Sequence, residues 1–143
     1  MAGDIELGSI HHVRLTVTDI ERSRAFYTGL LGFNVAAEAP ASDDPKSDPS
    51  YPVLWGGCVM TRGTYLLGLR PVANKGDRFD ENRVGLDHLS FSVDSRAALN
   101  DAIRFLDERG VQRGEVRELT SFGICVLAFR DPDNIQLELT SPL

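Results

Sequence analysis

The sequence predicts an α+β fold made of two tandem βαβββ half-modules, at about residues 8–70 and 85–141. Two observations predict it. First, His12 and His88, 76 positions apart, each open a segment with the pattern histidine, apolar, polar, apolar, polar, valine. Second, hydrophobic periodicity and turn residues indicate the order strand, helix and three strands in each half. An internal duplication within one domain of 143 residues explains both observations.

In the first half, residues 10–17 alternate between apolar and polar side chains, as a half-buried strand does. Asp19 is the expected N-cap of a helix that ends at Gly32. Residues 39–52 are rich in Pro, Ser and Asp and predict a long loop, of the kind that serves as a lid, a binding loop or a mobile insertion. Three further strands are expected at 33–37, 53–60 and 64–70.

The second half repeats this order after a polar connection at 71–84. A strand at 86–93 leads to a helix at 95–109, which Gly110 ends. The tetrapeptide from Asp131 to Asn134 is a turn signal, because Pro fixes φ and Asn tolerates a left-handed conformation. The remaining strands are expected at about 115–121, 123–130 and 134–140.

Composition excludes several classes of function. The formal charge of −6 and the absence of any basic run argue against nucleic-acid binding. The acidic N-terminal segment lacks the regions of a signal peptide, and no apolar run is long enough to span a membrane. We therefore expect a cytoplasmic protein with neither nucleic-acid nor membrane partners. Cys58 and Cys125, which are isolated in apolar runs, are expected to be buried structural thiols.

Strand parity divides three of the expected strands into an apolar face and a polar face. The polar faces carry His12, Arg14 and Thr16; His88, Ser90 and Ser92; and Gln136, Glu138 and Thr140. The other faces carry Val, Leu, Ile and Phe, which are suited to packing against the helices. This division predicts a cupped mixed sheet with helices on its outer face and a polar interior. Plain solvent exposure would give the same polar faces.

The sequence resembles the vicinal oxygen chelate superfamily, which comprises glyoxalase, bleomycin-resistance and dioxygenase-like proteins. The resemblance rests on His12-Val-Arg-Leu-Thr-Val-Thr-Asp19, Phe26-Tyr27 followed by Leu31-Gly32-Phe33, Asp87-His88-Leu-Ser-Phe-Ser-Val93 and Asp131-Pro-Asp-Asn-Ile-Gln-Leu-Glu138. It covers nearly the whole chain apart from 39–52. It implies the duplicated fold but does not fix a reaction, because this fold hosts several.

The resemblance implies a metal site with His12, His88 and Glu138 as ligands. A fourth ligand of the glyoxalase pattern, a carboxylate, would align with Gly68, which cannot ligate a metal. Two histidines and one carboxylate leave open positions that suit Fe2+, Mn2+, Ni2+ or Zn2+. The open positions would chelate two neighbouring oxygens of a small-molecule substrate. Residues expected to contact that substrate are Arg14, Ser90 and Gln136, although a cross-strand ion pair would equally explain Arg14.

The leading hypothesis is thus a metal-dependent enzyme, with the lyase, dioxygenase and transferase subclasses unresolved. The absence of a carboxylate at Gly68 disfavours glyoxalase isomerisation. Epimerisation is also disfavoured, because it needs a pair of acid/base carboxylates and only one is visible. The alternative is a protein that sequesters a small molecule or antibiotic without catalysis. A homodimer is expected, with each site formed either within the chain or across the two-fold interface.

Overall fold

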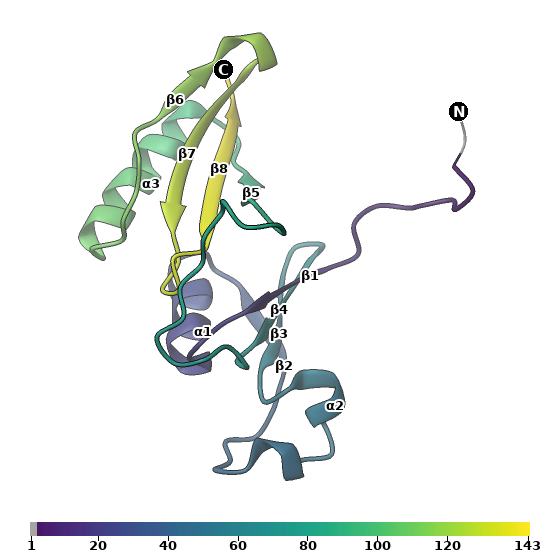
Figure 1. The fold of residues 1–143 in the computed structure, drawn as a ribbon. Helices are drawn as coiled ribbons and strands as arrows, with labels where there is room; N and C mark the ends of the chain where they lie inside the picture. Colours follow the sequence, from purple (N-terminus) through teal and green to yellow (C-terminus); the bar gives the residue numbers. More distant parts are fainter. Residues whose placement is uncertain (1–2) are drawn as a thin grey trace. The chain divides into compact units, whose positions relative to one another are not determined.

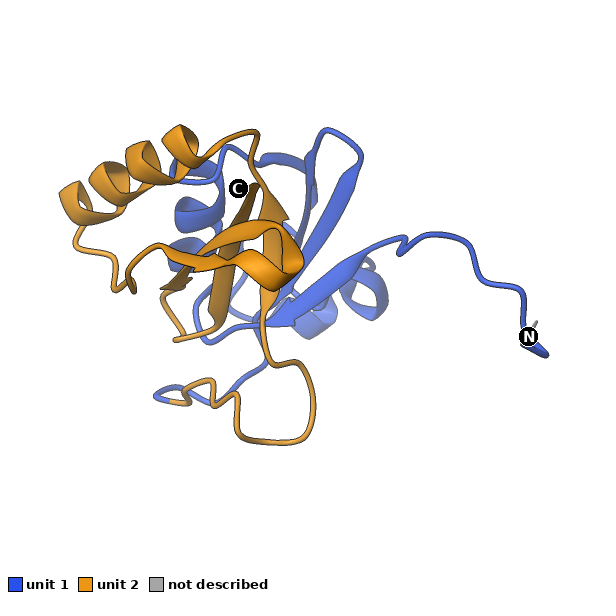
Figure 2. Cartoon of the chain, turned by 90° about the horizontal axis from the view of Figure 1, so that it is seen from above, with its two compact units in different colours: residues 1–76 blue, residues 77–143 orange. Residues whose placement is uncertain are grey.

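The computed structural model describes residues 3–143 and divides into two compact units, residues 1–76 and 77–143 (Figure 2). Each unit contains one four-stranded mixed sheet and a helix that contacts it (Figure 1). The α+β tandem βαβββ fold predicted from the sequence is confirmed. The strands form two separate sheets, one in each unit.

The first strand of unit 1, β1, begins at Val13, so His12 immediately precedes it. Its sheet has the order β1-β4-β3-β2, in which β1 pairs parallel with β4 and the other pairs are antiparallel. Asp19 caps α1 as expected, because its side chain accepts a hydrogen bond from the backbone N–H of Arg22. The elements are β1 (Val13–Thr16), α1 (Ile20–Gly29), β2 (Asn34–Glu38), β3 (Cys58–Arg62) and β4 (Tyr65–Arg70).

The segment between β2 and β3 differs from the expected loop and strand. A short 3-10 helix, η1 (Pro45–Ser47), and a helical turn, α2 (Tyr51–Leu54), occupy it, and the strand expected from residue 53 begins only at Cys58. Trp55 ends α2 with φ of 54°, and Gly56 follows with φ of 75°. The prediction of a strand at 53–57 was wrong because two successive left-handed residues are incompatible with an extended chain.

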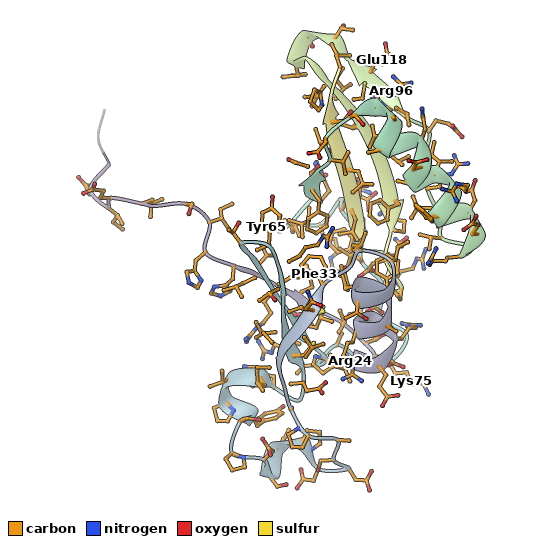
Figure 3. All side chains as sticks on the ribbon, turned by 180° about the vertical axis from the view of Figure 1, so that it is seen from behind. Arg24, Phe33, Tyr65, Lys75, Arg96 and Glu118 are labelled. Atoms are coloured by element: carbon orange, nitrogen blue, oxygen red, sulfur yellow. The ribbon has the colours of Figure 1, made fainter. Side chains whose placement is uncertain are left out.

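Unit 2 repeats the arrangement with the sheet order β5-β8-β7-β6 and a parallel pairing of β5 with β8. Its helix contacts β7 and β8 and buries Leu99 and Leu106. Arg96 at the start of that helix forms an ion pair of 2.7 Å with Glu118 of β6 (Figure 3). The elements are β5 (Leu89–Ser92), α3 (Arg96–Glu108), β6 (Arg117–Leu119), η2 (Thr120–Phe122), β7 (Ile124–Arg130) and β8 (Gln136–Pro142).

The core of each unit combines the apolar strand faces with buried residues of its helix. Leu15, Leu67 and Leu69 are buried in unit 1, and Leu137 and Leu139 are buried in unit 2. Cys58 and Cys125 are free and buried, as expected, and burial raises the pKa of the Cys58 thiol. Among residues 3–143, no helix is both long and apolar enough to cross a membrane.

The expected polar connection at 71–84 is partly folded onto unit 2. Its residues 78–81 bind the turn between β7 and β8, where Asn134 has φ of 66°, as the turn signal predicted. The Asn134 side-chain amide donates to the Phe79 carbonyl over 3.0 Å, and the Phe79 N–H donates to the Asp133 carbonyl over 2.9 Å. Arg130 adds a two-pronged ion pair with Glu81, at 2.7 and 3.0 Å.

Candidate metal centre

His88 and Glu138 lie close together on the polar face of the unit 2 sheet. His88 immediately precedes β5, and Glu138 lies in β8 opposite Ser90 in the parallel register. His88 Nε2 and Glu138 Oε1 are 3.9 Å apart, and their side chains are 39% and 18% exposed. Metal ions bind imidazole nitrogen and carboxylate oxygen at about 2.0–2.2 Å, so one ion placed between these atoms could contact both.

Asp87 orients the His88 ring. His88 Nδ1 and Asp87 Oδ1 are 2.6 Å apart. Because an ionised carboxylate only accepts, the proton of this hydrogen bond belongs to Nδ1; in the neutral imidazole the lone pair is then on Nε2, the nitrogen 3.9 Å from Glu138 Oε1. A carboxylate behind a histidine is the usual arrangement that fixes the tautomer of a metal ligand.

A chain of two hydroxyl groups ends on the Glu138 carboxylate. Thr140 Oγ1 donates to Glu138 Oε1 over 3.2 Å, and Ser90 Oγ lies 2.6 Å from Thr140 Oγ1. Because Thr140 uses its proton on Glu138, Ser90 is the donor in the second bond. Ser90, which the sequence suggested as a substrate contact, therefore belongs to the network that holds Glu138. Gln136 is half-buried and shares this polar face of β8.

His12 lies in unit 1, in the position that corresponds to His88. It is exposed, and its Nδ1 is 2.9 Å from Nδ1 of His11, with the two rings edge to face. Where His12 Nδ1 is the donor to His11 Nδ1, the neutral His12 ring has its lone pair on Nε2, and that nitrogen is then available to a metal ion. Alternation of side chains along the strand assigned His11 to a different face, which is why sequence reasoning missed this contact.

Gly68 lies in β4 opposite Arg14 of β1. In unit 2 the same place in the register holds Glu138, opposite Ser90 of β5. The two units thus pair their first and last strands alike, and Gly68 is the counterpart of Glu138. Unit 1 contributes no carboxylate at this position.

The structure brings two of the three expected ligands together within one unit and places the third, His12, in the other. Within neither unit do the described residues form a group of three or more His, Cys, Asp or Glu side chains spaced to hold a metal ion. The donor types of His88 and Glu138, the orientation of His88 by Asp87 and their separation fit a divalent cation. The three-ligand set remains a prediction.

Unit 1 also contains a groove of about 970 Å³ that sequence reasoning did not anticipate. It lies between α1, the segment 39–57 and the residues that follow β4. Arg24 on α1 reaches Glu38 of β2 at its wall, over 2.8 Å (Figure 3). Trp55 also lines it and is overlaid by the Arg70 guanidinium, 3.9 Å from the ring centre.

This groove is separate from His12. Thr18 and Val72 line it just beyond the C-terminal ends of β1 and β4, whereas His12 precedes the N-terminal end of β1. The six residues from His12 to Thr18 correspond to about 20 Å of extended strand. The signal that could have revealed the groove was the cluster of Pro, Ser and aromatic residues at 39–55.

Comparison with known proteins agrees with this architecture. Residues 9–139 match the family model of the Glyoxalase/Bleomycin resistance protein/Dioxygenase superfamily. The uncharacterized protein YwkD of Bacillus subtilis is 32% identical over 136 residues, which cover 93% of this chain and 96% of YwkD. A glyoxylase/bleomycin resistance protein/dioxygenase domain from Frankia sp. EAN1pec is 30% identical with a TM-score of 0.75, over 96% of this chain and 94% of that one.

The fosfomycin resistance protein FosX from Listeria monocytogenes has a TM-score of 0.72 at 14% identity, over 96% of this chain and 94% of that one, and shares the fold alone. The match over residues 9–139, the identity to the Frankia domain and the duplicated βαβββ architecture lead to one assignment. The chain belongs to the glyoxalase, bleomycin resistance protein and dioxygenase superfamily.

Proposed function

We propose that this protein is a divalent-metal-dependent enzyme that chelates a small oxygenated substrate through the metal. The observation that carries the proposal is the pair formed by His88 and Glu138, 3.9 Å apart, with Asp87 hydrogen-bonded behind the histidine. A histidine that only packs or faces solvent needs neither a carboxylate hydrogen-bonded to Nδ1 nor another carboxylate near Nε2. A metal ligand uses both.

His12, His88 and Glu138 are the proposed ligands of Fe2+, Mn2+, Ni2+ or Zn2+. When bound, such an ion polarises substrate oxygens and stabilises negative charge that develops on them. Three protein ligands leave coordination positions for the substrate. Thr140 and Ser90 keep the Glu138 carboxylate oriented, and Gln136 on the same face is a candidate hydrogen-bonding partner for the substrate.

The reaction subclass follows in part from Gly68. A glycine at the counterpart of Glu138 leaves unit 1 without a carboxylate to act as a base there. Isomerisation that uses such a base is therefore disfavoured, and the lyase, dioxygenase and transferase subclasses remain as proposals. We further propose that the enzyme acts in the cytoplasm as a homodimer.

A second candidate function is sequestration of a small molecule without turnover, and the groove in unit 1 favours it. The two functions differ in the need for metal. A sequestering protein that uses this groove binds its ligand equally with and without a divalent ion, because His12 lies at the other end of the sheet.

The first test is the metal content of the purified protein before and after reconstitution with each of the four ions. We expect about one ion per chain in the wild type. We expect none in His88→Ala or Glu138→Gln, with the circular dichroism spectrum unchanged. His12→Ala should lose most of the metal as well, because it removes one of three ligands.

His11→Ala is the matched control for stoichiometry, since it removes an exposed imidazole that contacts His12 but is not a proposed ligand; the protein should still bind about one ion per chain. Wild-type protein that takes up no metal under any condition would contradict the proposed enzyme and favour sequestration. Loss of folding in His88→Ala would instead assign that histidine a structural role.

A further inference from the structure

The two units pair their first and last strands in the same register, but they place opposite charges there. In unit 2, Ser90 of β5 is opposite Glu138 of β8. In unit 1, Arg14 of β1 is opposite Gly68 of β4. Unit 1 thus has glycine where unit 2 has the anionic Glu138. The residue opposite that glycine is the cationic Arg14.

Gly68 is explained by the Arg14 side chain that lies across it. A Cβ atom added at Gly68 would be 2.9 Å from Arg14 Nε and 3.2 Å from Arg14 Cγ, closer than ordinary van der Waals contact. The φ angle of Gly68 is not positive, so the backbone conformation does not require glycine there. Without a Cβ atom at Gly68 the arginine side chain lies close across the strand, and a larger residue would make that flexible side chain shift.

Arg14 is not committed to an ion pair. In the described part of unit 1, residues 3–76, no carboxylate lies within ion-pair distance of its guanidinium, whereas Arg24 is paired with Glu38. The cross-strand ion pair that would have explained Arg14 is therefore not formed within its sheet. The side chain is exposed, and it projects from the same strand face as His12, two residues earlier and about 7 Å along the strand.

We propose that Arg14 determines substrate specificity by binding an oxyanionic group of the substrate, a carboxylate or a phosphonate, beside His12. This inference rests on the proposed function, in which His12 is a metal ligand. The planar guanidinium presents paired N–H donors that match two oxygens of such a group. Packing along Gly68 holds the guanidinium in place, which reduces the entropy lost when the anion binds. The substrate class is thus a small oxygenated anion.

The test is calorimetric titration with methylphosphonate, which carries a single oxyanionic group, on metal-free and Zn2+-loaded protein. We expect Arg14→Gln to weaken binding about tenfold or more, the effect of one charge-assisted hydrogen bond. Arg14→Lys, which keeps the charge but loses the fork, should retain part of the affinity. Gly68→Ala should also weaken binding although Arg14 is unchanged, because the new Cβ displaces the guanidinium.

Arg83→Gln is the control, since Arg83 is an exposed arginine in unit 2 and its removal changes the net charge equally. It should leave the affinity unchanged. Metal content measured on every variant separates the two proposals. Normal metal uptake with no effect of Arg14→Gln, or no methylphosphonate binding by either wild-type form, overturns the role of Arg14 and leaves the metal centre standing. Anion binding that depends on Arg14 in a protein that takes up no metal supports Arg14 and overturns the enzyme.

Discussion

At the scale of single residues, Asp87 has the clearest part in the candidate centre. It precedes His88 in the chain, and its carboxylate lies 2.6 Å from His88 Nδ1. The carboxylate is largely exposed, with 66% of the side chain accessible to solvent. Its contribution is therefore to the orientation and basicity of the imidazole, because an exposed contact of this kind adds little to folding stability.

Asp87→Asn is expected to weaken metal binding about 10- to 100-fold while the number of ions bound at saturation stays the same. The amide can still accept from Nδ1, but without charge it makes the imidazole a poorer donor to the metal. Competition against a coloured chelator measures the affinity. The control is Asp94→Asn, at an exposed acid just after β5, the strand that Asp87 precedes; it should have no effect on the affinity. An equal loss in both variants would mean that general charge, and not orientation of His88, sets the affinity.

At the scale of elements, the segment 78–81 is attached to the turn between β7 and β8 by the ion pair of Glu81 with Arg130. The hydrogen bonds from the Arg130 guanidinium lower the pKa of Glu81 from 4.5 to about 2. A lowered pKa means that the folded state favours the ionised carboxylate. Its contribution to stability is therefore complete above pH 4.5 and is lost as the pH falls toward 2.

We expect Glu81→Gln to lower the free energy of unfolding at pH 7 and to flatten its decline between pH 4.5 and pH 2. Chemical denaturation at a series of pH values measures both effects. The control is Glu6→Gln, at an exposed residue near the N-terminus. A decline as steep in Glu81→Gln as in the wild type would show that other carboxylates account for the acid sensitivity.

The entry into β3 depends on Gly57. A Cβ atom at this position would lie 1.8 Å from the Leu69 carbonyl oxygen and 2.9 Å from Pro71 Cδ. Gly57→Ala should therefore destabilise the protein by about 2 kcal/mol or more, because the backbone of β3 and β4 must separate. Gly29→Ala is the matched control, since nothing lies within 4 Å of its added Cβ and alanine favours a helix. Thermal unfolding compares them, and equal midpoints would contradict the close approach.

At the scale of the whole molecule, the duplication was predictable from the sequence and the segment 39–57 was not. The repeated strand pattern and the helical periodicity that follows it in each half are local signals, so they predicted both βαβββ units. Residues 53–60 read as an apolar strand because the alternative, a helical turn ended by Trp55 with a positive φ, contradicts local preference. The contact of Trp55 with Arg70, 15 residues later, is not visible in a local pattern.

The candidate site likewise has a part that the sequence predicted and a part that depends on strand pairing. The repeat located His12 and His88, the family resemblance implied Glu138, and alternation along strands assigned the faces of all three. The hydroxyl chain from Ser90 through Thr140 to Glu138 depends on the pairing of two strands almost 50 residues apart, which no local pattern encodes. The contact of Arg14 with Gly68 depends likewise on the register of β1 with β4.

Trp55 gives the molecule a built-in optical signal. It is the chain's single tryptophan, and it lies at the wall of the unit 1 groove beneath the Arg70 guanidinium. Indole emission responds to nearby charge and to water, so all tryptophan fluorescence of this protein comes from one side chain in a known setting. A molecule that enters the groove would change that emission without any label, whereas unit 2 has no indole of its own.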